Sequence, residues 1–319
     1  MATSNSYDFT DTVTRDAIIK FGLRKIGVLK RGQTLSAEDI SDASFALNLI
    51  IKQWQDRSDG APSIKMWLRK RLVLFLQNGQ NEYHVGSNAV DHCADVDDLL
   101  ETTITAAASS GASTLTLDSV SGADDTYYIG LYQDNGIIHW TTINGAPAGN
   151  VVTLTAVTTY DAASGNTVYV YSTKVQPPLY LLTQYYRNEN GDDWPLGKLS
   201  LQEYDLIPDK DEQGTPGSFY YEKALSEGVF YFDSAVEDAR DTLRMTVHYP
   251  AQDMDSAGDT FDFADVWLRP LGYMLGLDLA PEYGIEIDQG LMLLAQDAAK
   301  IARDSDPETT DMSFEPGRD

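Results

Sequence analysis

The stretch DVWLRPLGYMLGLDLAPEYG, residues 265–284, has the pattern of a helix that is apolar on nearly every face. At 3.6 residues per turn its leucines form one stripe, and Gly272, Gly276 and Ala280 form a second stripe of small residues. Such a helix is buried at the centre of a domain, and small residues let a neighbouring helix approach closely. We therefore predict that six of its residues pack in the core: Trp267, Leu271, Gly272, Leu275, Gly276 and Ala280.

The ends of this central helix are marked by residues with known positional preferences. Asp265 is a candidate N-cap, Pro270 predicts a kink in the first turn, and the run from Pro281 to Gly284 predicts the stop. An apolar run of about 16 residues is too short to span a membrane.

Three other segments have helical periodicity. Residues 14–31 and 36–60 are amphipathic patterns joined by a short loop, which predicts an antiparallel helix hairpin. The second pattern opens with SAED at Ser36, a capping box with aspartate in place of the more usual glutamate. A last helix is predicted over residues 288–303, with four residues facing inward: Leu291, Leu294, Ala298 and Ile301.

The period changes to that of strands after Pro62. Asn78-Gly79 separates two β-rich runs and predicts a hairpin, and residues 88–101 read as an acidic loop. The block 102–173 is rich in Thr, Ala, Gly, Val and Tyr, and its short strand patterns alternate with turn signals. We predict that this block is an inserted small β-sandwich or barrel.

Together these patterns predict an α+β fold. Its body would be a helical bundle, built from the N-terminal helix hairpin and the C-terminal helices, and it would carry an antiparallel β-meander and the inserted β-domain. The predicted parts are a helical hairpin (1–71), a β-hairpin with an acidic loop (72–101), the insert (102–173), the meander (174–258), the C-terminal helices (259–303) and an extended tail (304–319).

Charge is distributed unevenly along the chain. Residues 1–71 carry 12 basic and 8 acidic residues, whereas the remainder carries 11 basic and 41 acidic residues, and 102–173 contains no Lys or Arg. An acidic surface repels phosphate, which argues against sequence-specific nucleic-acid binding. The alternative explanation of the acidic charge is that it keeps the protein soluble. We also expect no secretory leader, no membrane span and, with one cysteine in the chain, a reducing compartment.

No pattern in the chain predicts catalysis or a cofactor. His84, His92, Cys93 and Asp95 do not have the spacing of a zinc site, and the common nucleotide-binding, hydrolase and metalloprotease motifs are missing from the sequence. The aromatic runs 219–221 and 230–232 have two interpretations, a sugar-binding groove or core and cross-strand pairs, and alternation along strands favours the second. We therefore predict a protein that is not an enzyme and binds neither metal nor cofactor.

Several stretches of the chain, taken in order, resemble one known family. They are RDAIIKFGLRKIGVL (15–29), SAEDISDASFALNLIIKQWQ (36–55), Pro178, DWPLGKLSLQEYDLIP (193–208), GTPGSFYY (214–221), GVFYF (228–232) and WLRPLGYMLGLDLAPEYG (267–284). In this order they resemble the head-to-tail adaptor proteins of short-tailed bacteriophages, also called packaged-DNA stabilisation or tail tubular adaptor proteins. Two positions depart from the family pattern, since Asp233-Ser234 stands where Trp-Pro is common, and Ala264 stands where proline often opens the next-to-last helix.

The resemblance implies a structural virion protein located in the neck between capsid and tail and assembled in the cytoplasm of the bacterial host. Such subunits form a homo-oligomeric ring, usually of about twelve copies. The ring docks under the portal protein, continues the DNA channel, helps to retain packaged DNA and provides the platform for the tail nozzle or fibres. Double-stranded DNA would pass through without sequence-specific binding, and no membrane is involved.

Three interaction surfaces are expected within this role. The tail 304–319 would meet the portal through Met312, Phe314 and Glu315, and the insert 102–173 would meet tail nozzle or fibre proteins. A basic cluster would meet the acidic surface of a neighbouring subunit: Lys65, Arg69, Lys70 and Arg71. Two rival interpretations are a virion-associated glycan hydrolase and a carbohydrate-binding module.

Overall fold

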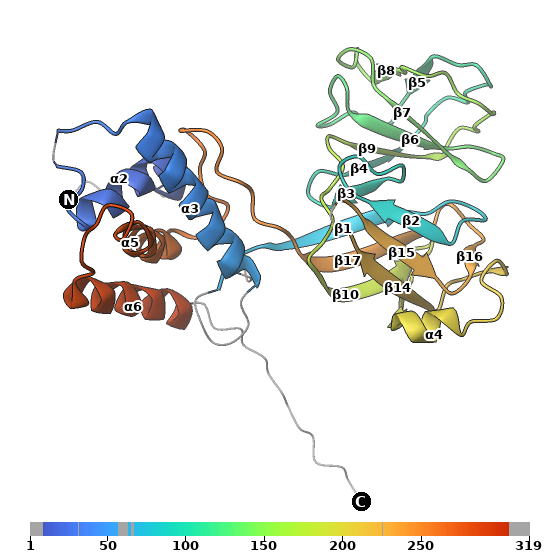
Figure 1. Ribbon diagram of the computed structural model, residues 1–319. Helices are drawn as coiled ribbons and strands as arrows, with labels where there is room; N and C mark the ends of the chain where they lie inside the picture. Colours follow the sequence, from blue (N-terminus) through green and yellow to red (C-terminus); the bar gives the residue numbers. More distant parts are fainter. Residues whose placement is uncertain (1–8, 31, 57–62, 65–66, 225, 306–319) are drawn as a thin grey trace, which may run out of the picture. The chain divides into compact units, whose positions relative to one another are not determined.

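The computed structural model describes residues 9–30, 32–56, 63–64, 67–224 and 226–305. The chain forms two compact units, one made of Met1–Arg69 with Pro250–Asp319, and one made of Lys70–Tyr249 (Figure 1). The tail residues Met312, Phe314 and Glu315 lie outside the described residues, as does Lys65 of the basic cluster.

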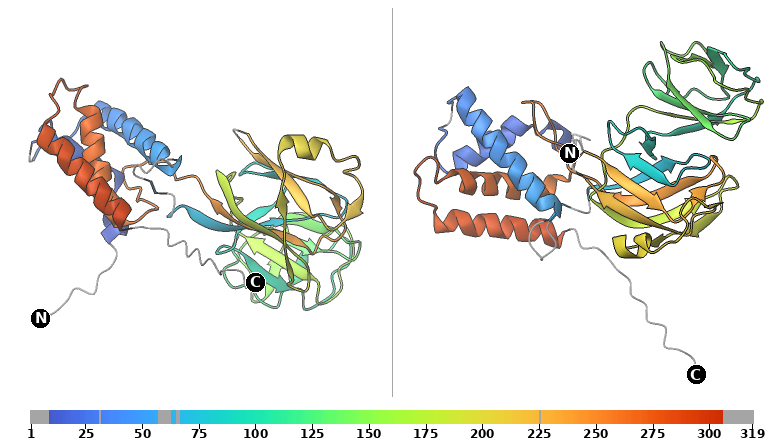
Figure 2. Two further views of the ribbon diagram at one scale, coloured as in Figure 1. Left: turned by 90° about the horizontal axis from the view of Figure 1, so that it is seen from below. Right: turned by 45° about the vertical axis from the view of Figure 1, so that its right-hand side comes forward.

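The smaller unit is helical, with α5 at its centre. In Figures 1 and 2, α5 lies among the other helices of this unit, and it contacts α2, α3 and α6. The helices are α1 (Phe9–Thr12), α2 (Arg15–Lys25), α3 (Ala37–Asp56), the 3-10 turn η1 (Asp265–Trp267), α5 (Leu268–Leu279) and α6 (Gln289–Asp304).

The small residues of α5 pack against α2. A Cβ atom on Gly276 would lie 2.8 Å from the carbonyl oxygen of Gly22, and a Cβ atom on Gly22 would lie 2.9 Å from the carbonyl oxygen of Gly272. Two helix backbones are therefore in direct contact, which only glycine permits. The six residues for which core packing was predicted are all buried, and Trp267 packs against Trp54 of α3 at a ring distance of 5.7 Å.

The start of this helix differs from the prediction. Asp265 is not an N-cap, because it is the first residue of η1 and makes no capping hydrogen bond; Ala264 precedes the turn in extended conformation. Pro270 lies in the first turn of α5, where its missing N–H is not needed. In place of the predicted kink, the start of the helix has the preceding 3-10 turn η1. The helix ends at Leu279, and Gly284 adopts a φ of 64° in the following turn.

The capping box of α3 is present. The Ser36 hydroxyl accepts the Asp39 N–H at 3.1 Å, and the Asp39 carboxylate accepts the Ser36 N–H at 3.2 Å. Asp39 also accepts the Tyr283 hydroxyl at 2.8 Å, so the start of α3 is joined to the turn after α5. These hydrogen bonds from Ser36 and Tyr283 lower the pKa of Asp39.

The inward face of α6 was predicted wrongly in part. Leu294 and Ile301 are 50% and 55% exposed, and the buried residues of this helix are four alanines: Ala295, Ala298, Ala299 and Ala302. Ala295 and Ala298 pack against Tyr273 of α5. Because α6 lies so close to its neighbours, only small side chains fit on the facing ridge, and the leucines are displaced to the flank.

The larger unit contains a β-sandwich. Sheet one has the order β11-β10-β17-β1-β3, and sheet two has the order β12-β14-β15-β2. The two sheets share one hydrophobic core, to which β1, β2, β14, β15 and β17 contribute. The elements are β1 (Arg69–Phe75), β2 (Glu82–Val85), β3 (Cys93–Asp95), β10 (Tyr180–Arg187), β11 (Asp193–Pro195), β12 (Gly197–Lys198), α4 (Leu201–Asp205), β13 (Gln213–Gly214), β14 (Ser218–Lys223), β15 (Gly228–Phe232), β16 (Ala235–Val236) and β17 (Thr242–His248).

The insert forms two further sheets with their own core. A four-stranded sheet has the order β4-β9-β6-β7, and β5 pairs with β8. Strands β5 to β9 fall within the predicted block of short strand patterns, and β4 lies at its entrance. They are β4 (Leu100–Thr103), β5 (Thr114–Thr116), β6 (Tyr128–Tyr132), β7 (Ile138–Thr142), β8 (Val151–Thr153) and β9 (Thr167–Tyr171).

The insert is docked on the sandwich through aromatic side chains. Phe75, at the end of β1, lies 5.0 Å from Trp140 and 4.6 Å from Tyr169 between ring centroids. The Gln77 side chain accepts the Ile138 N–H at 3.0 Å and donates to the Ile138 carbonyl at 2.9 Å. The second half of β1, from Leu72 to Phe75, is thus buried on both faces, one toward the sandwich core and one toward the insert.

The predicted fold class is wrong. The structure is 24% helical and consists mostly of strands in several antiparallel sheets, so a helical bundle is not its body. No closed barrel occurs in the part of the chain that the structure describes. Strong helical periodicity at both ends of the sequence favoured a helical body. The larger unit is instead formed by residues 70–249, which contain many short strands.

Three predictions of strand arrangement are also wrong. Gly79 has the expected positive φ of 78°, but β1 and β2 enter different sheets, so the chain around Asn78-Gly79 crosses between sheets and forms no hairpin. The segment 88–101, expected to be a loop, contains β3 and the start of β4. The strands of 174–258 likewise divide between the two sheets and form no single meander, because β10 pairs with the distant β17.

Candidate functional site

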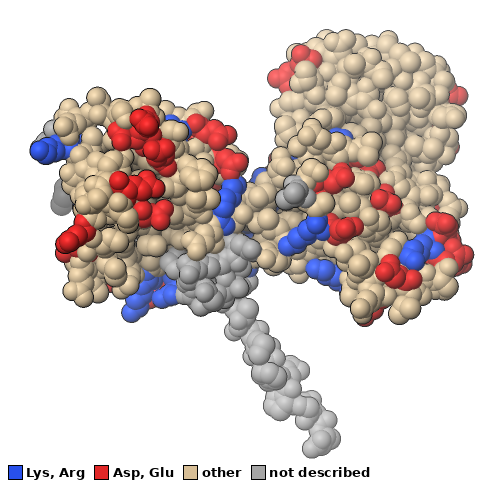
Figure 3. Space-filling model, in the orientation of Figure 1, with Lys and Arg blue, Asp and Glu red and all other residues tan. Residues whose placement is uncertain are grey.

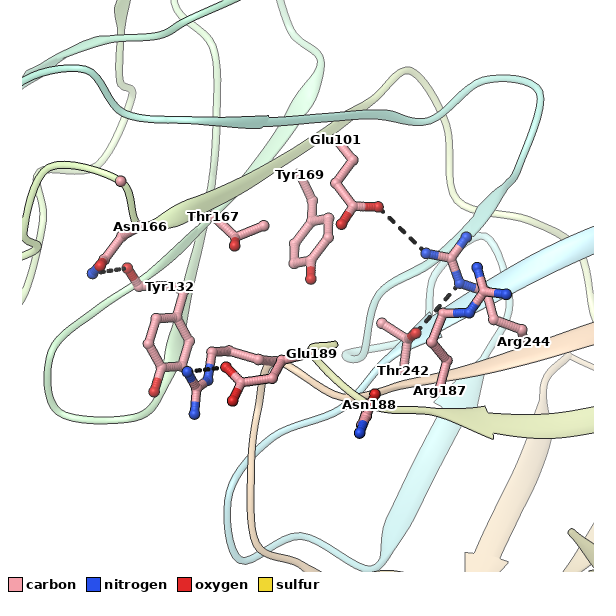
Figure 4. A pocket seen from close by; sticks show the side chains of 12 residues that line it. Glu101, Tyr132, Asn166, Thr167, Tyr169, Arg187, Asn188, Glu189, Thr242 and Arg244 are labelled. Atoms are coloured by element: carbon pink, nitrogen blue, oxygen red, sulfur yellow. Dashed lines mark hydrogen bonds and ion pairs between the residues drawn. The ribbon is translucent and has the colours of Figure 1, made fainter. Parts of the chain in front are cut away.

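A polar pocket of about 250 Å³ lies within the larger unit, between strands of the insert and the β10–β17 pair. Figure 4 shows its side chains: Glu101, Thr167 and Tyr169 come from β4 and β9, and Arg187 and Arg244 come from β10 and β17. Sequence reasoning did not find this site, because the residues lie up to 143 positions apart and share no motif.

Each arginine of the pocket is paired with a carboxylate. Arg187 binds Asp193 through two hydrogen bonds of 2.6 and 2.8 Å, and these bonds lower the pKa of Asp193. Arg244 reaches Glu101 of the insert at 3.4 Å. The guanidinium groups are therefore neutralised, and the pocket does not present the net positive charge that phosphate binding requires.

The third arginine belongs to a network at the edge of the pocket. Arg240 binds both oxygens of Asp238 and forms an ion pair with Glu189. Next to it, the Tyr186 hydroxyl donates to Asp241, which also accepts the Glu189 N–H at 3.1 Å. Burial raises the pKa of the Asp241 carboxyl.

This network has the character of a structural joint. Glycoside hydrolysis uses two carboxyl groups that face a bound sugar, one of them free to protonate the leaving group. Here Glu101 and Glu189 each point to an arginine, and Asp241 is covered by the Tyr186 hydroxyl. The arrangement ties the insert to the sandwich through Arg244 and Glu101, and no pair of carboxylates in this pocket is free for acid–base chemistry.

The residues considered above as possible metal ligands, which include His92 and Cys93, make other interactions. His92 stacks on Trp140 at 3.9 Å between ring centroids and shares a 2.6 Å hydrogen bond with the Tyr171 hydroxyl. Burial lowers the pKa of His92 to about 3 and raises the pKa of the buried Cys93 thiol. Within the described residues no group of three or more His, Cys, Asp or Glu is arranged to hold a metal ion.

Two residues of the basic cluster, Lys70 and Arg71, form ion pairs. Lys70 lies 2.9 Å from Asp95, with its ammonium group 4.7 Å from the centre of the Tyr249 ring. Arg71 lies 3.2 Å from Asp97, and both side chains are largely exposed, at 67% and 80%. An exposed pair of this kind contributes little to stability and can exchange partners.

The two aromatic runs divide between core and surface. Phe219, Phe230 and Phe232 are buried in the sandwich, as alternation along the strands suggested. Tyr220 and Tyr231 point the other way and stack on each other at 6.0 Å, and Tyr204 of α4 lies against both rings. Because α4 supplies a third ring to this stack, the outward tyrosines already have a partner within the chain.

Charged side chains are unevenly distributed on the surface. Figure 3 shows acidic side chains on the face of the helical unit that carries α3, where Glu38 and Asp42 are exposed. The insert has a different surface, rich in uncharged polar residues and without Lys or Arg between 102 and 173. Among the described helices, none is long and apolar enough to cross a membrane.

Comparisons with known proteins do not identify the chain. No model of a protein family matches the sequence, and a search of curated proteins finds no match. The resemblance to phage adaptors therefore depends on the motifs in this sequence alone.

Proposed function

We propose that this chain is a structural virion protein, the subunit of a head-to-tail adaptor ring that docks under the portal and continues the DNA channel toward the tail. The observation that carries the proposal is the ordered set of motifs. Apart from Pro178, each falls on one or more helices or strands of the structure. The first two correspond to α2 and α3, the middle three to β11–β12–α4, β14 and β15, and the last to η1 and α5.

Two physical features support this role. The formal charge of −26 and the pairing of the pocket arginines leave little surface for gripping DNA, which suits a channel through which DNA must move. The larger unit offers neither a free pair of carboxylates in its polar pocket nor, among described residues, a metal cluster, which suits a structural protein.

The proposal assigns a partner to each surface. The tail 304–319, with Met312, Phe314 and Glu315, binds the portal; the insert 102–173 binds tail nozzle or fibre proteins; and the basic cluster of Lys65, Arg69, Lys70 and Arg71 binds a neighbouring subunit. The exposed Arg71–Asp97 pair is consistent with the last assignment, since it can open to accept an acidic partner.

The test is attachment of the purified protein to isolated portal rings, observed by negative-stain electron microscopy. We expect an added ring of density on one face of the portal, lost when residues 304–319 are deleted while the circular-dichroism spectrum stays that of the intact chain. A chain that leaves portal rings bare, or that degrades capsule or cell-wall polysaccharide, would contradict the proposal.

The insert requires a more careful variant than deletion. Removing 102–173 would expose Phe75, which packs against Trp140 and Tyr169, so loss of function could follow from misfolding. Substitutions at Val157, whose side chain is 49% exposed and lies apart from Phe75, Trp140 and Tyr169, leave this docking surface intact. We expect such variants to bind portal rings normally and to fail in recruiting tail components.

A further inference from the structure

Helix α6 exposes large apolar side chains on the side away from the core. Leu293, Leu294 and Ile301 are 61%, 50% and 55% exposed, and we call them the α6 patch. Leu294 and Ile301 are seven residues apart and therefore lie on one side of the helix, two turns apart. Three half-exposed large side chains on one helix are more than the scattered single ones that a surface normally carries.

Helix α3 carries a second such surface. Phe45 and Leu49 are 69% and 53% exposed and lie one turn apart, and we call them the α3 patch. Glu38 and Asp42, both exposed, lie on the N-terminal side of this patch.

The two patches lie on different sides of the helical unit. Both helices contact α5 with their buried faces, α3 through residues such as Leu47 and α6 through Ala295 and Ala298, so their exposed faces point away from α5 (Figure 1). One copy of the chain therefore cannot cover its own α6 patch with its own α3 patch.

We propose that the α6 patch of one copy binds the α3 patch of the next copy. Two different patches on one subunit make a heterologous contact, and such a contact repeats from copy to copy until a ring closes. The inference deepens the proposed function and rests on it, since it names an apolar contact between neighbouring subunits that acts beside the contact assigned to the basic cluster.

Area and charge favour a second copy as the occupant. At about 200 Å² per large side chain, the exposed parts of the two patches amount to roughly 600 Å². That is more than a third of the 1,600 Å² or so buried in a standard interface, which leaves the remainder for a polar rim. Lys300 lies beside Ile301 at the C-terminal end of α6, so antiparallel packing of the two helices brings it toward Glu38 and Asp42.

Cysteine cross-linking between two single variants tests the contact. The only native cysteine, Cys93, is buried and does not interfere. We expect a mixture of Phe45→Cys and Leu294→Cys chains to form a disulfide-linked dimer under mild oxidation, and the double variant to form a ladder of larger oligomers. As a control, Leu206→Cys at the C-cap of α4, where Leu206 is 81% exposed, should give no such product with Leu294→Cys.

Sedimentation provides an independent measurement. Leu294→Glu adds a charge to a half-exposed position, so the fold should be retained, and self-association should weaken about 30-fold or more if this residue is central to the interface. The proposal would be overturned if Phe45→Cys chains alone formed dimers equally well. It would also be overturned if no mixed cross-link formed either in solution or on portal rings. Rings that assemble on the portal without the mixed cross-link would leave the adaptor function standing and show this contact to be wrong. A mixed cross-link in a protein that does not bind portal rings would support this contact and contradict the adaptor function.

Discussion

Replacing Gly276 with alanine adds a methyl group at the closest contact between α5 and α2. The added Cβ would lie 2.8 Å from the Gly22 carbonyl oxygen and 3.4 Å from its carbonyl carbon. A carbon and an oxygen in van der Waals contact are about 3.3 Å apart, so the two helices must separate by about half an ångström. The neighbour is backbone and cannot rotate away, so the whole helix must move.

The size of the effect follows from two opposing contributions. Overpacking a tight core costs about 1–3 kcal/mol, and the higher helix propensity of alanine returns up to about 1 kcal/mol. We expect Gly276→Ala to lower the free energy of unfolding of the helical unit by about 1–2 kcal/mol. Gly272→Ala should cost less, because its Cβ would meet the ring of Phe21, which is half-buried and can turn.

Gly290→Ala in α6 is the matched control. Its Cβ would lie 3.0 Å from the Asp288 carboxylate, which caps α6 by accepting the Leu291 N–H; this exposed side chain can shift slightly, so the variant should cost less than Gly276→Ala. Urea unfolding followed by circular dichroism at the helix band reports on the helical unit, because all the long helices that the structure describes lie in this unit. If Gly276→Ala unfolds at the same urea concentration as the parent chain and Gly290→Ala, the backbone contact is not the constraint that we infer.

Three further predictions concern single interactions. Burial lowers the pKa of His92 to about 3, below the value of about 6.5 in an unfolded chain, so the larger unit should lose stability as the pH falls from about 6.5 toward 3. His92→Gln should flatten that slope in thermal unfolding, and an unchanged slope would assign it to other groups. Gln77→Ala leaves both backbone groups of Ile138 without their side-chain partner, and should cost about 2 kcal/mol and speed amide exchange in the insert; unaltered exchange there would contradict the docking role of Gln77. Ser36→Ala removes the cap of α3 and should cost about 1 kcal/mol, whereas Ser36→Asp should retain most of the stability; equal losses in both variants would rule out the capping hydrogen bond as the cause.

Local patterns located most of the elements correctly. The helix at Leu268–Leu279, the capping box at Ser36 and the strands of the insert depend on interactions between residues a few positions apart. Such interactions are encoded by periodicity and by turn residues, and these are visible in a single chain.

The candidate site was not visible in the same way. The polar pocket joins Glu101 to Arg244, and neither residue lies in a motif. The only signal for this pocket in the sequence is that basic residues are few in this part of the chain, which makes each arginine there a candidate for a site. The α6 patch was missed for a different reason, since the helical periodicity of apolar residues placed Leu294 and Ile301 on the inward face.

The sequence by itself determined where most of the helices and strands form, which helix lies at the centre of the helical unit, and that the chain is strongly acidic. Only the tertiary structure decided that β1 and β2 join different sheets, that strands make up the larger unit, and that the alanines of α6, not its leucines, face the core. The physical reason is distance along the chain: backbone conformation depends on near neighbours, whereas strand pairing and the choice of buried face depend on partners that only folding brings together.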